Sequence, residues 1–205
     1  MTVQQHWDDR HRSTPVEELS WFQPTPATSL ELFDSLGVDS SDAVIDVGGG
    51  VSMLAAALVE RGFGDVTVLD VSKEALDAAA ERLPAPSRVS WVVADVRTWR
   101  PPRAWRVWHD RAVFHFLTTT EDRDAYLRTM SQALAAGGAL VIGTFAPDGS
   151  DHCSGLPTQR YDANTLLETI STQLDVESVT ATQEVHVTPN GAAQSFTWIA
   201  GRRRA

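Results

Sequence analysis

The sequence predicts an α/β protein with a mostly parallel sheet, helices on both faces of that sheet and an antiparallel hairpin at the end. From residue 43 to residue 144, short valine-rich runs alternate with helical segments, a pattern typical of parallel strands joined by helices. These runs are apolar on both sides, so helices must cover both faces. Two later strand-like runs flank Asn190-Gly191, a dipeptide typical of a tight hairpin turn.

The individual elements follow from local patterns. Residues 1–25 carry Trp7, Trp21 and Phe22 among charges and prolines, which predicts one or two short helices. Apolar residues at 30, 32, 33 and 36 predict a helix over 29–36 that Gly37 ends. Ser72 is expected to cap a helix that runs to about Leu83 and stops at Pro84 and Pro86. The remaining predictions are strands at 43–47, 65–70, 88–94, 105–109, 139–144, 176–187 and 194–200, helices at 51–61, 121–135 and 163–174, and a turn at Gly137-Gly138 before the fifth strand.

Composition bounds the class of protein. The 205 residues suit a single domain, with an N-terminal helical segment at 1–37 and a core at 40–200. A net charge of −10 argues against a nucleic-acid partner, because such binding relies on clustered cations. Cys153 is the only cysteine, which excludes an internal disulfide and a cysteine-based zinc site. The polar N-terminus and the absence of a long apolar run predict a soluble cytoplasmic protein without a membrane partner.

The stretch VIDVGGGVSML, residues 44–54, places three glycines between a strand and a helix. Backbone N–H groups at such a turn, together with the helix N-terminus, bind nucleotides and anions. The alternative is a tight turn that needs glycine only for its conformation. The dinucleotide pattern G-x-G-x-x-G fails because Met53 occupies its third place. The pattern D-x-G-x-G fits, with Asp46 before Gly48, Gly49 and Gly50.

Three carboxylates end consecutive predicted strands. Asp46 would repel a pyrophosphate and attract a ligand that carries an amino group and a sulfonium. Asp70, twenty residues after Gly50, is placed to accept from ribose hydroxyls. Asp95 is placed to accept from the exocyclic amine of adenine, with Val96 against the ring. Asp46 or Asp70 alone could instead cap a helix, but the three together predict one crevice at the carboxyl edge of the sheet.

These motifs resemble those of the class I S-adenosylmethionine-dependent methyltransferases. VIDVGGG is similar to the family's first motif, VTVLDVS to the second, VVADVRTW to the third and VWHDRAVFHFL to the fourth. The resemblance covers residues 40–200 and departs at Ser52, where the family often has a glycine. It implies a Rossmann-like seven-stranded sheet, S-adenosylmethionine as cofactor and S-adenosylhomocysteine as product. The cofactor-binding residues that it implies are Asp46, Gly48, Gly49, Gly50, Asp70, Val71, Asp95, Val96, His109 and Trp7.

The leader HWDDRHRSTPVEELSWFQ resembles the N-terminal segment of the small single-domain branch, which includes thiopurine-type, thiol and halide methyltransferases and some protein-lysine methyltransferases. In those relatives the leader folds over cofactor and substrate. The resemblance therefore implies a helical lid in which Trp7 and Trp21 face the ligands. The alternative is ordinary aromatic packing of these two side chains.

Catalytic candidates follow the fourth strand. Methyl transfer is an in-line displacement that mainly requires alignment, and a base is needed only if the nucleophile arrives protonated. We expect a base, if there is one, among Asp110, Arg111 and His115. His115 has a suitable ordinary pKa, but it is also placed to pack between Phe114 and Phe116. Arg111 is a candidate to orient an anionic substrate or to pair with a carboxylate such as Asp110.

The segment at 147–161 is polar and rich in turns and follows the fifth strand, where loops tend to carry specificity. His152, Cys153, Arg160 and Tyr161 are therefore candidates for the acceptor pocket. Together with His115, His152 and Cys153 lack a recognised ligand spacing, so no metal site is expected.

The sequence favours methylation of a small molecule at S, Se, N or O, because a compact chain of 205 residues leaves no appended recognition domain. Methylation of a protein, most plausibly at lysine, is an alternative that is weakened because Arg111 follows Asp110 where such enzymes often have proline or an aromatic residue. A non-catalytic S-adenosylmethionine-binding protein and, more distantly, a nicotinamide oxidoreductase are further alternatives.

Overall fold

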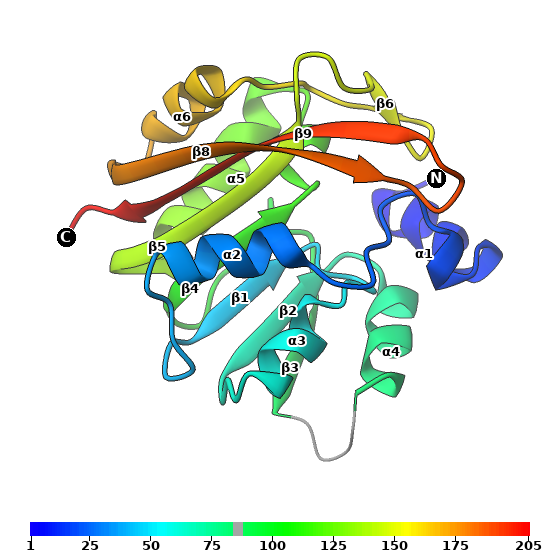
Figure 1. Cartoon of the computed structure of the whole chain (residues 1–205), viewed down its shortest axis with the longest axis horizontal. Coiled ribbons are helices and arrows are strands. Elements are labelled where there is room, and N and C mark those ends of the chain that lie inside the picture. Colours follow the sequence, from blue (N-terminus) through cyan, green and yellow to red (C-terminus); the bar gives the residue numbers. More distant parts are fainter. Residues whose placement is uncertain (84–87) are drawn as a thin grey trace.

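A computed structural model describes residues 1–83 and 88–205 and shows a seven-stranded sheet flanked by helices (Figure 1). The sheet strands are β1 (Val44–Val47), β2 (Val66–Asp70), β3 (Val89–Val93), β4 (Trp105–Arg111), β5 (Leu134–Phe145), β8 (Val176–Val187) and β9 (Ala193–Arg203). The helices are α1 (Val3–Ser13), η1 (Val16–Glu18), α2 (Ala27–Ser35), α3 (Leu54–Glu60), α4 (Lys73–Glu81), η2 (Phe114–Phe116), α5 (Thr120–Ala133) and α6 (Ala163–Ser171). The short strands β6 (His152–Cys153) and β7 (Leu156–Pro157) form a separate small hairpin.

The strand order is β3-β2-β1-β4-β5-β9-β8. The first five of these strands run parallel, whereas β9 is antiparallel to both of its neighbours. The turn that joins β8 to β9 is closed by a hydrogen bond from the backbone N–H of Gly191 to the carbonyl oxygen of Thr188. The mostly parallel sheet and its final antiparallel hairpin confirm the fold class that the sequence predicts.

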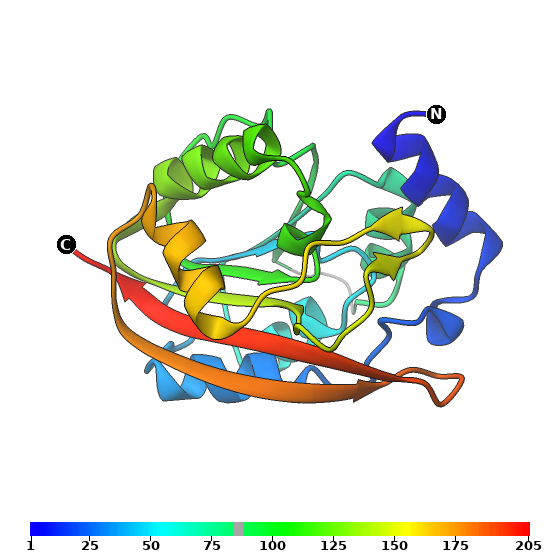
Figure 2. The same ribbon diagram turned by 90° about the horizontal axis from the view of Figure 1, so that it is seen from above.

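Helices pack on both faces of the sheet, as Figure 2 shows for α2 and α5 on opposite sides. One buried cluster joins α2 and α3 to side chains such as Val44 and Val107. The other joins α5 and α6 to side chains such as Ile45 and Trp108. Neighbouring residues of β1 and β4 thus contribute to opposite clusters, because successive side chains of a strand point to opposite faces. This alternation decides which residues of β4 can reach a site.

Several predicted boundaries are wrong: α6 ends at Ser171 and not at residue 174, and β9 runs to Arg203 and not to residue 200. Two further errors have an identifiable cause. Helix α3 begins at Leu54 and not at residue 51, because the turn that starts at the glycines continues through Met53. The predicted turn at Gly137-Gly138 lies inside β5, which begins at Leu134 directly after α5. The pairing of β5 with β4 is irregular over this stretch: Leu134 lies opposite Trp105, and the next pair is Ala139 with Val107. Ser72 caps α4 as predicted, whereas Pro84 and Pro86 lie outside the described residues.

The N-terminal segment is attached to the body at several places, two of which lie at α4 and at β8. At α4, the Ser72 hydroxyl donates to Asp8 Oδ1 at 2.7 Å, and the Arg12 guanidinium lies 3.2 Å from a Glu74 oxygen. At β8, the Gln23 amide donates to Glu184 Oε1, and the ring Nε2 of His186 donates to the Ser20 carbonyl oxygen at 2.8 Å. Residues 8–23 therefore bridge α4 and the far edge of the sheet. No helix among the described residues is long and apolar enough to cross a bilayer.

Candidate functional site

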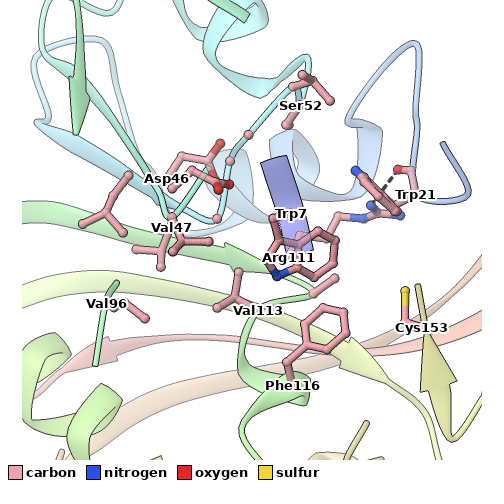
Figure 3. A pocket seen from close by; sticks show the side chains of 18 of the residues that line it. Trp7, Trp21, Asp46, Val47, Ser52, Val96, Arg111, Val113, Phe116 and Cys153 are labelled. Carbon is pink, nitrogen blue, oxygen red and sulfur yellow. Dashed lines mark hydrogen bonds between the residues drawn. The ribbon is translucent and has the colours of Figure 1, made fainter. Parts of the chain in front are cut away.

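A cavity of about 310 Å³ lies at the carboxyl ends of the parallel strands. Its floor comes from the glycine turn after β1 and from the ends of β2 and β4, while residues of α1 and of the segment at 21–26 close it from the other side. In Figure 3, Asp46 and Val47 lie on one side of this cavity, Trp21 and Cys153 on the other, and Trp7 between them. The strand ends and the N-terminal segment therefore border one partly enclosed space.

The glycine turn brings backbone close to the cavity, and the protein itself explains why glycine is required there. Gly48 has φ +67°, and a Cβ at this position would lie 1.9 Å from a methyl carbon of Val113. A Cβ on Gly49 would lie 2.4 Å from Asp46 Oδ2 and 2.7 Å from a methyl carbon of Val68. Both glycines and Gly50 line the cavity. The turn therefore needs glycine to fit against the rest of the protein, and the same glycines also lie where a ligand could bind.

Asp46 is buried beneath this turn and is joined to α2 through His109. Its Oδ1 accepts from His109 Nδ1 at 2.7 Å, and His109 Nε2 accepts from the Ser29 hydroxyl at 2.9 Å. An ionised Asp46 can only accept a hydrogen bond, so His109 Nδ1 must carry the proton that it donates. Asp46 Oδ2 has no hydrogen-bond partner among the described residues. Since buried carboxylate oxygens are normally satisfied, this atom is open to a donor from a ligand.

Asp70 lies at the end of β2 and lines the cavity beside the glycine turn. Its Oδ1 accepts from the Ser72 backbone N–H at 2.8 Å. Burial raises the pKa of Asp70 to about 7; the nearby Asp46 adds to the rise, and hydrogen bonds from the backbone of Ser72 and Gly50 oppose it. No cation of the described residues forms an ion pair with Asp70. A positively charged ligand, or hydroxyl donors, would therefore favour the ionised form.

Asp95 and Val96 also line the cavity, but the Asp95 carboxylate already has a partner. Arg97 binds it through Nε at 3.0 Å and Nη2 at 2.6 Å, and Arg97 Nη1 reaches Asp122 at 2.7 Å. Burial tends to raise the pKa of Asp95, but the hydrogen bonds from Arg97 outweigh it, and the pKa lies below its ordinary value. The charge of Asp95 is thus neutralised within the protein, whereas no Arg or Lys side chain of the described residues pairs with Asp46 or Asp70.

Aromatic and apolar side chains close the cavity. Trp7 packs edge to face on Trp21, with ring centres 5.7 Å apart, and on Phe116, at 5.2 Å. All three line the cavity together with Val71 and the buried Cys153. Burial raises the pKa of the Cys153 thiol. The structure thus brings Trp7, Trp21, Val71 and Cys153 together, as the sequence predicts, although Trp7 and Trp21 also pack against each other.

Arg111, the last residue of β4, extends toward Trp21 (Figure 3). Its Nη1 donates to the Trp21 carbonyl oxygen at 3.0 Å, and its Cζ lies 4.7 Å from the centre of the Phe196 ring. Nε and Nη2 are shielded from solvent and have no hydrogen-bond partner in the described part of the chain. Burial lowers the pKa of Arg111, and Glu184 opposes this shift. The predicted pairing with Asp110 does not occur, because the two side chains leave β4 on opposite faces.

Two predicted catalytic residues do not reach the cavity. Asp110 is fully buried on the α5 face, where it accepts from the backbone N–H of Val113 at 2.8 Å and from the Tyr126 hydroxyl at 2.6 Å. Burial raises its pKa to about 6. Its side chain fixes the turn after β4 and does not line the cavity.

His115 is fully buried and does not line the cavity. Its ring lies 4.4 Å from that of Phe145 and 4.5 Å from that of Phe116, and its Nδ1 accepts from the Phe145 backbone N–H at 3.3 Å. Burial, together with the charge of Arg111, lowers the pKa of His115 to about 3. The ring therefore packs against Phe116 and Phe145 and not between Phe114 and Phe116, and its Nε2 has no hydrogen-bond partner among the described residues. This placement gives no support to a role as general base.

Three further candidates lie outside the cavity lining. His152 is exposed, and its Nδ1 lies 3.0 Å from Asp151 Oδ1. Arg160 is exposed, and its Nη1 donates to the Gly149 carbonyl oxygen at 3.4 Å. Tyr161 is buried against Phe114, with ring centres 5.6 Å apart. The polar segment at 147–161 therefore contributes Cys153, Leu156 and Pro157 to the cavity, not its basic and phenolic side chains.

Sequence reasoning missed several lining residues. His11, one helical turn after Trp7 on α1, lines the cavity, and burial lowers its pKa to about 4. The i, i+4 spacing of Trp7 and His11 was the available signal. Phe116 lines the cavity where its neighbour His115 was predicted. No group of three His, Cys, Asp or Glu side chains is arranged to hold a metal ion within residues 1–83 and 88–205.

The residues present fit S-adenosylmethionine. The open Oδ2 of Asp46 and the uncompensated carboxylate of Asp70 lie at the glycine turn, where an amino group, a sulfonium and ribose hydroxyls would each find an acceptor. A pyrophosphate would meet two carboxylates without a cation beside them.

Comparison with known proteins agrees with this geometry. The family model "Methyltransferase domain" matches residues 44–138. The chain is 30% identical over 179 residues to thiocyanate methyltransferase 1 of Arabidopsis thaliana, and the match covers 84% of this chain and 75% of that protein. It is 27% identical over 150 residues to methyltransferase GfsG of Streptomyces halstedii, which covers 71% of this chain but only about half, 51%, of that protein.

Among solved structures, the N-methyltransferase NodS of Bradyrhizobium japonicum WM9, crystallised with S-adenosylhomocysteine, superposes with a TM-score of 0.70 at 18% identity, and the match covers 100% of both chains. At this identity the likeness shows the fold. The fold, the family model and the sequence relative together lead to one assignment: the chain belongs to the class I S-adenosylmethionine-dependent methyltransferases.

Proposed function

We propose that this methyltransferase transfers the methyl group to a small molecule that is enclosed in the cavity beneath the N-terminal segment. The proposal rests mainly on one observation: Trp7, His11 and Trp21 line the same cavity as Asp46 and Asp70. A small acceptor fits an enclosed space of this kind. One relative, thiocyanate methyltransferase 1, is named for a small nucleophile of this class.

In this proposal the carboxyl ends of β1, β2 and β3 hold the donor. Asp46 Oδ2 accepts from the amino group, Asp70 accepts from the ribose hydroxyls, and Val71 and Val96 pack near the adenine. Gly48, Gly49 and Gly50 let the backbone approach the methionine part. Asp95 keeps its ion pair with Arg97 and offers its remaining lone pairs to the adenine amine.

When bound, S-adenosylmethionine supplies an electrophilic methyl group on a good leaving group. The task of the chain is therefore to align the acceptor and to exclude water. Residues 1–26, which precede α2, act as a lid in this proposal, and Trp7 and Phe116 keep water from the methyl group. Of the lining residues, His11 is a neutral imidazole at pH 7 because burial lowers its pKa to about 4.

The test separates small from macromolecular acceptors. A cell extract is divided into a low-mass ultrafiltrate and dialysed protein, and each is incubated with the enzyme and methyl-labelled S-adenosylmethionine. We expect S-adenosylhomocysteine and labelled small molecules from the ultrafiltrate only. Label in the dialysed protein would favour the lysine-methylation alternative, and binding of the donor without turnover in either fraction would favour a sensor.

Cofactor binding is expected to release protons near neutral pH. The pKa of Asp70 is about 7 in the free protein, and hydrogen bonds from ribose hydroxyls favour the ionised carboxylate and lower this pKa on binding. The complex then binds fewer protons than the free protein, so affinity rises as pH increases toward 7 and levels off above it.

Calorimetry with S-adenosylhomocysteine at pH 6.5, in two buffers of different ionisation enthalpy, measures the proton release. Asp70→Asn removes the titrating group and should abolish most of it. Equal proton release from the variant would show that another group is responsible.

A further inference from the structure

We propose that the methyl acceptor carries a carboxylate, which binds to the Nε–Nη2 edge of Arg111 at the side of the cavity away from Asp46 and Asp70. This inference rests on the proposed function, since acceptor and donor are taken to share one cavity. It adds the chemical class of the acceptor and the side chain that selects it.

The free edge of the guanidinium has the shape that a carboxylate needs. Nη1 is already committed to the Trp21 carbonyl oxygen at 3.0 Å, whereas Nε and Nη2 have no partner among the described residues. In the planar guanidinium, the N–H bonds of Nε and Nη2 point in the same direction. They can therefore donate in parallel to two oxygens of one carboxylate, which is the preferred geometry of arginine with this group.

Arg111 forms no ion pair with a carboxylate of the described residues, although the charge of Glu184 acts on it from a distance. Its nearest influential carboxylate, Glu184, is used by other donors: Oε1 accepts from the Gln23 amide and Oε2 accepts from Trp198 Nε1 at 2.8 Å. The Cys153 thiol is neutral because burial raises its pKa. Guanidinium nitrogens that are shielded from water and have no hydrogen-bonded counter-ion are unfavourable, so an anionic ligand would supply the ion pair that the described residues do not form.

The other groups that face Arg111 do not oppose an anion. His115 and His186 are both less basic than usual because of burial, with the charge of Arg111 adding to each shift, so they are neutral at pH 7. Arg10, on α1, also acts on Cys153 and adds positive potential to this part of the cavity. Its Nε has no hydrogen-bond partner in the described part of the chain.

The cavity therefore has two electrically different parts. The donor part holds the acidic side chains Asp46 and Asp70, which both lie at the glycine turn. The Trp21 part holds the cationic Arg111, on the other side from Asp46 in Figure 3. Between them lie apolar side chains such as Trp7, Phe116 and Val113. An acceptor with an apolar body and a carboxylate at one end matches this arrangement and would be oriented with its other end toward the methyl group.

The test measures binding of carboxylates and of their uncharged amides. Phenylacetate, hexanoate and succinate, each with its amide, are titrated by calorimetry into the protein saturated with S-adenosylhomocysteine in a carboxylate-free buffer. We expect at least one acid to bind and its amide to bind about 10–100-fold more weakly, the effect of a charge-assisted hydrogen-bond pair. Amides that bind as tightly as their acids, or no binding by any acid, would overturn the proposal.

Variants assign the effect to Arg111. Arg111→Gln should weaken acid binding about 10–100-fold and leave amide binding nearly unchanged. Arg111→Lys keeps the positive charge but cannot donate two parallel hydrogen bonds to one carboxylate. Its affinity for the acid should therefore lie between those of Arg111→Gln and the wild type. The matched control is Arg106→Gln, an exposed arginine at the start of the same strand. Equal acid affinity in Arg111→Gln and wild type would contradict the assignment.

The affinity for S-adenosylhomocysteine, measured on the same samples, keeps the two proposals apart. A normal cofactor affinity without acid binding would refute the carboxylate site and leave the proposed donor site intact. Acid binding that depends on Arg111 in a protein without cofactor affinity would refute the proposed donor site alone. If Arg111→Gln fails to fold, the comparison of acid with amide on the wild type still decides.

Discussion

Replacing Asp70 with alanine is expected to weaken cofactor binding by about 2–4 kcal/mol, because a pair of charge-assisted hydrogen bonds is lost. Asp70 lines the cavity beside Gly50 and has no cation as a partner, so its charge is available to the ligand. Folding should not suffer to the same degree, since removing a carboxylate that lies near Asp46 also removes repulsion between them. Calorimetry with S-adenosylhomocysteine measures the affinity, and urea denaturation measures the stability.

The matched control is Asp65→Ala, which removes a carboxylate just before the same strand. Asp65 forms a partly exposed ion pair with Arg103 and lies away from the cavity. Its loss should leave cofactor affinity unchanged. An Asp70 variant that binds the cofactor as tightly as the wild type would refute the ribose assignment.

Replacing Asp110 with alanine is expected to lower the free energy of unfolding by about 3–5 kcal/mol. The carboxylate accepts from the Tyr126 hydroxyl and from the backbone N–H groups of Val113 and Phe114, all in the interior. Alanine would leave these donors without an acceptor. Urea denaturation checks the change, and Asp110→Asn, which keeps one carbonyl oxygen, should lose less.

Cofactor affinity distinguishes this structural role from a catalytic one. The folded fraction of Asp110→Ala should bind S-adenosylhomocysteine nearly as well as the wild type, because Asp110 does not line the cavity. Asp77→Ala, an exposed acid on α4 that pairs with Lys73, should change stability by less than about 1 kcal/mol. A variant of Asp110 with unchanged stability and lost turnover would restore the catalytic interpretation.

Most of the sheet could be predicted from the sequence because its signals are local. Valine-rich runs, the Ser72 cap and the Asn190-Gly191 turn each act within a few residues, and each is found where it was expected. The errors occur where tertiary pairing decides the boundary. Gly137 and Gly138 have the composition of a turn, yet β5 continues through them as an irregularity back to Leu134, which pairs with Trp105 of β4.

The donor side of the site was also accessible to sequence reasoning, because parallel strands bring their ends to one edge. Asp46, Asp70 and Asp95 therefore line one cavity, as expected. The sequence could not show that Arg97 forms an ion pair with Asp95, whereas no Arg or Lys side chain of the described residues pairs with Asp46 or Asp70. That difference depends on side-chain geometry across several elements.

The acceptor side was harder, because the stretch WHDRAVFHF contains several reactive side chains in a row. The alternation of β4 directs His109 and Arg111 toward the cavity and Asp110 away from it. The short helix η2 then buries His115 and presents Phe116. Because neighbouring side chains in this stretch point in different directions, only some of these residues can contact a substrate.

The contacts of residues 20–23 with β8 have a consequence for how the protein is made. The Gln23–Glu184 and Ser20–His186 hydrogen bonds join positions separated by 161 and 166 residues. During synthesis on the ribosome, residues 20–23 emerge long before β8 and β9 do. This side of the cavity therefore cannot assemble until the hairpin strands have also emerged. Contacts this remote are slow to establish, so binding competence should be among the last properties that a newly made molecule acquires.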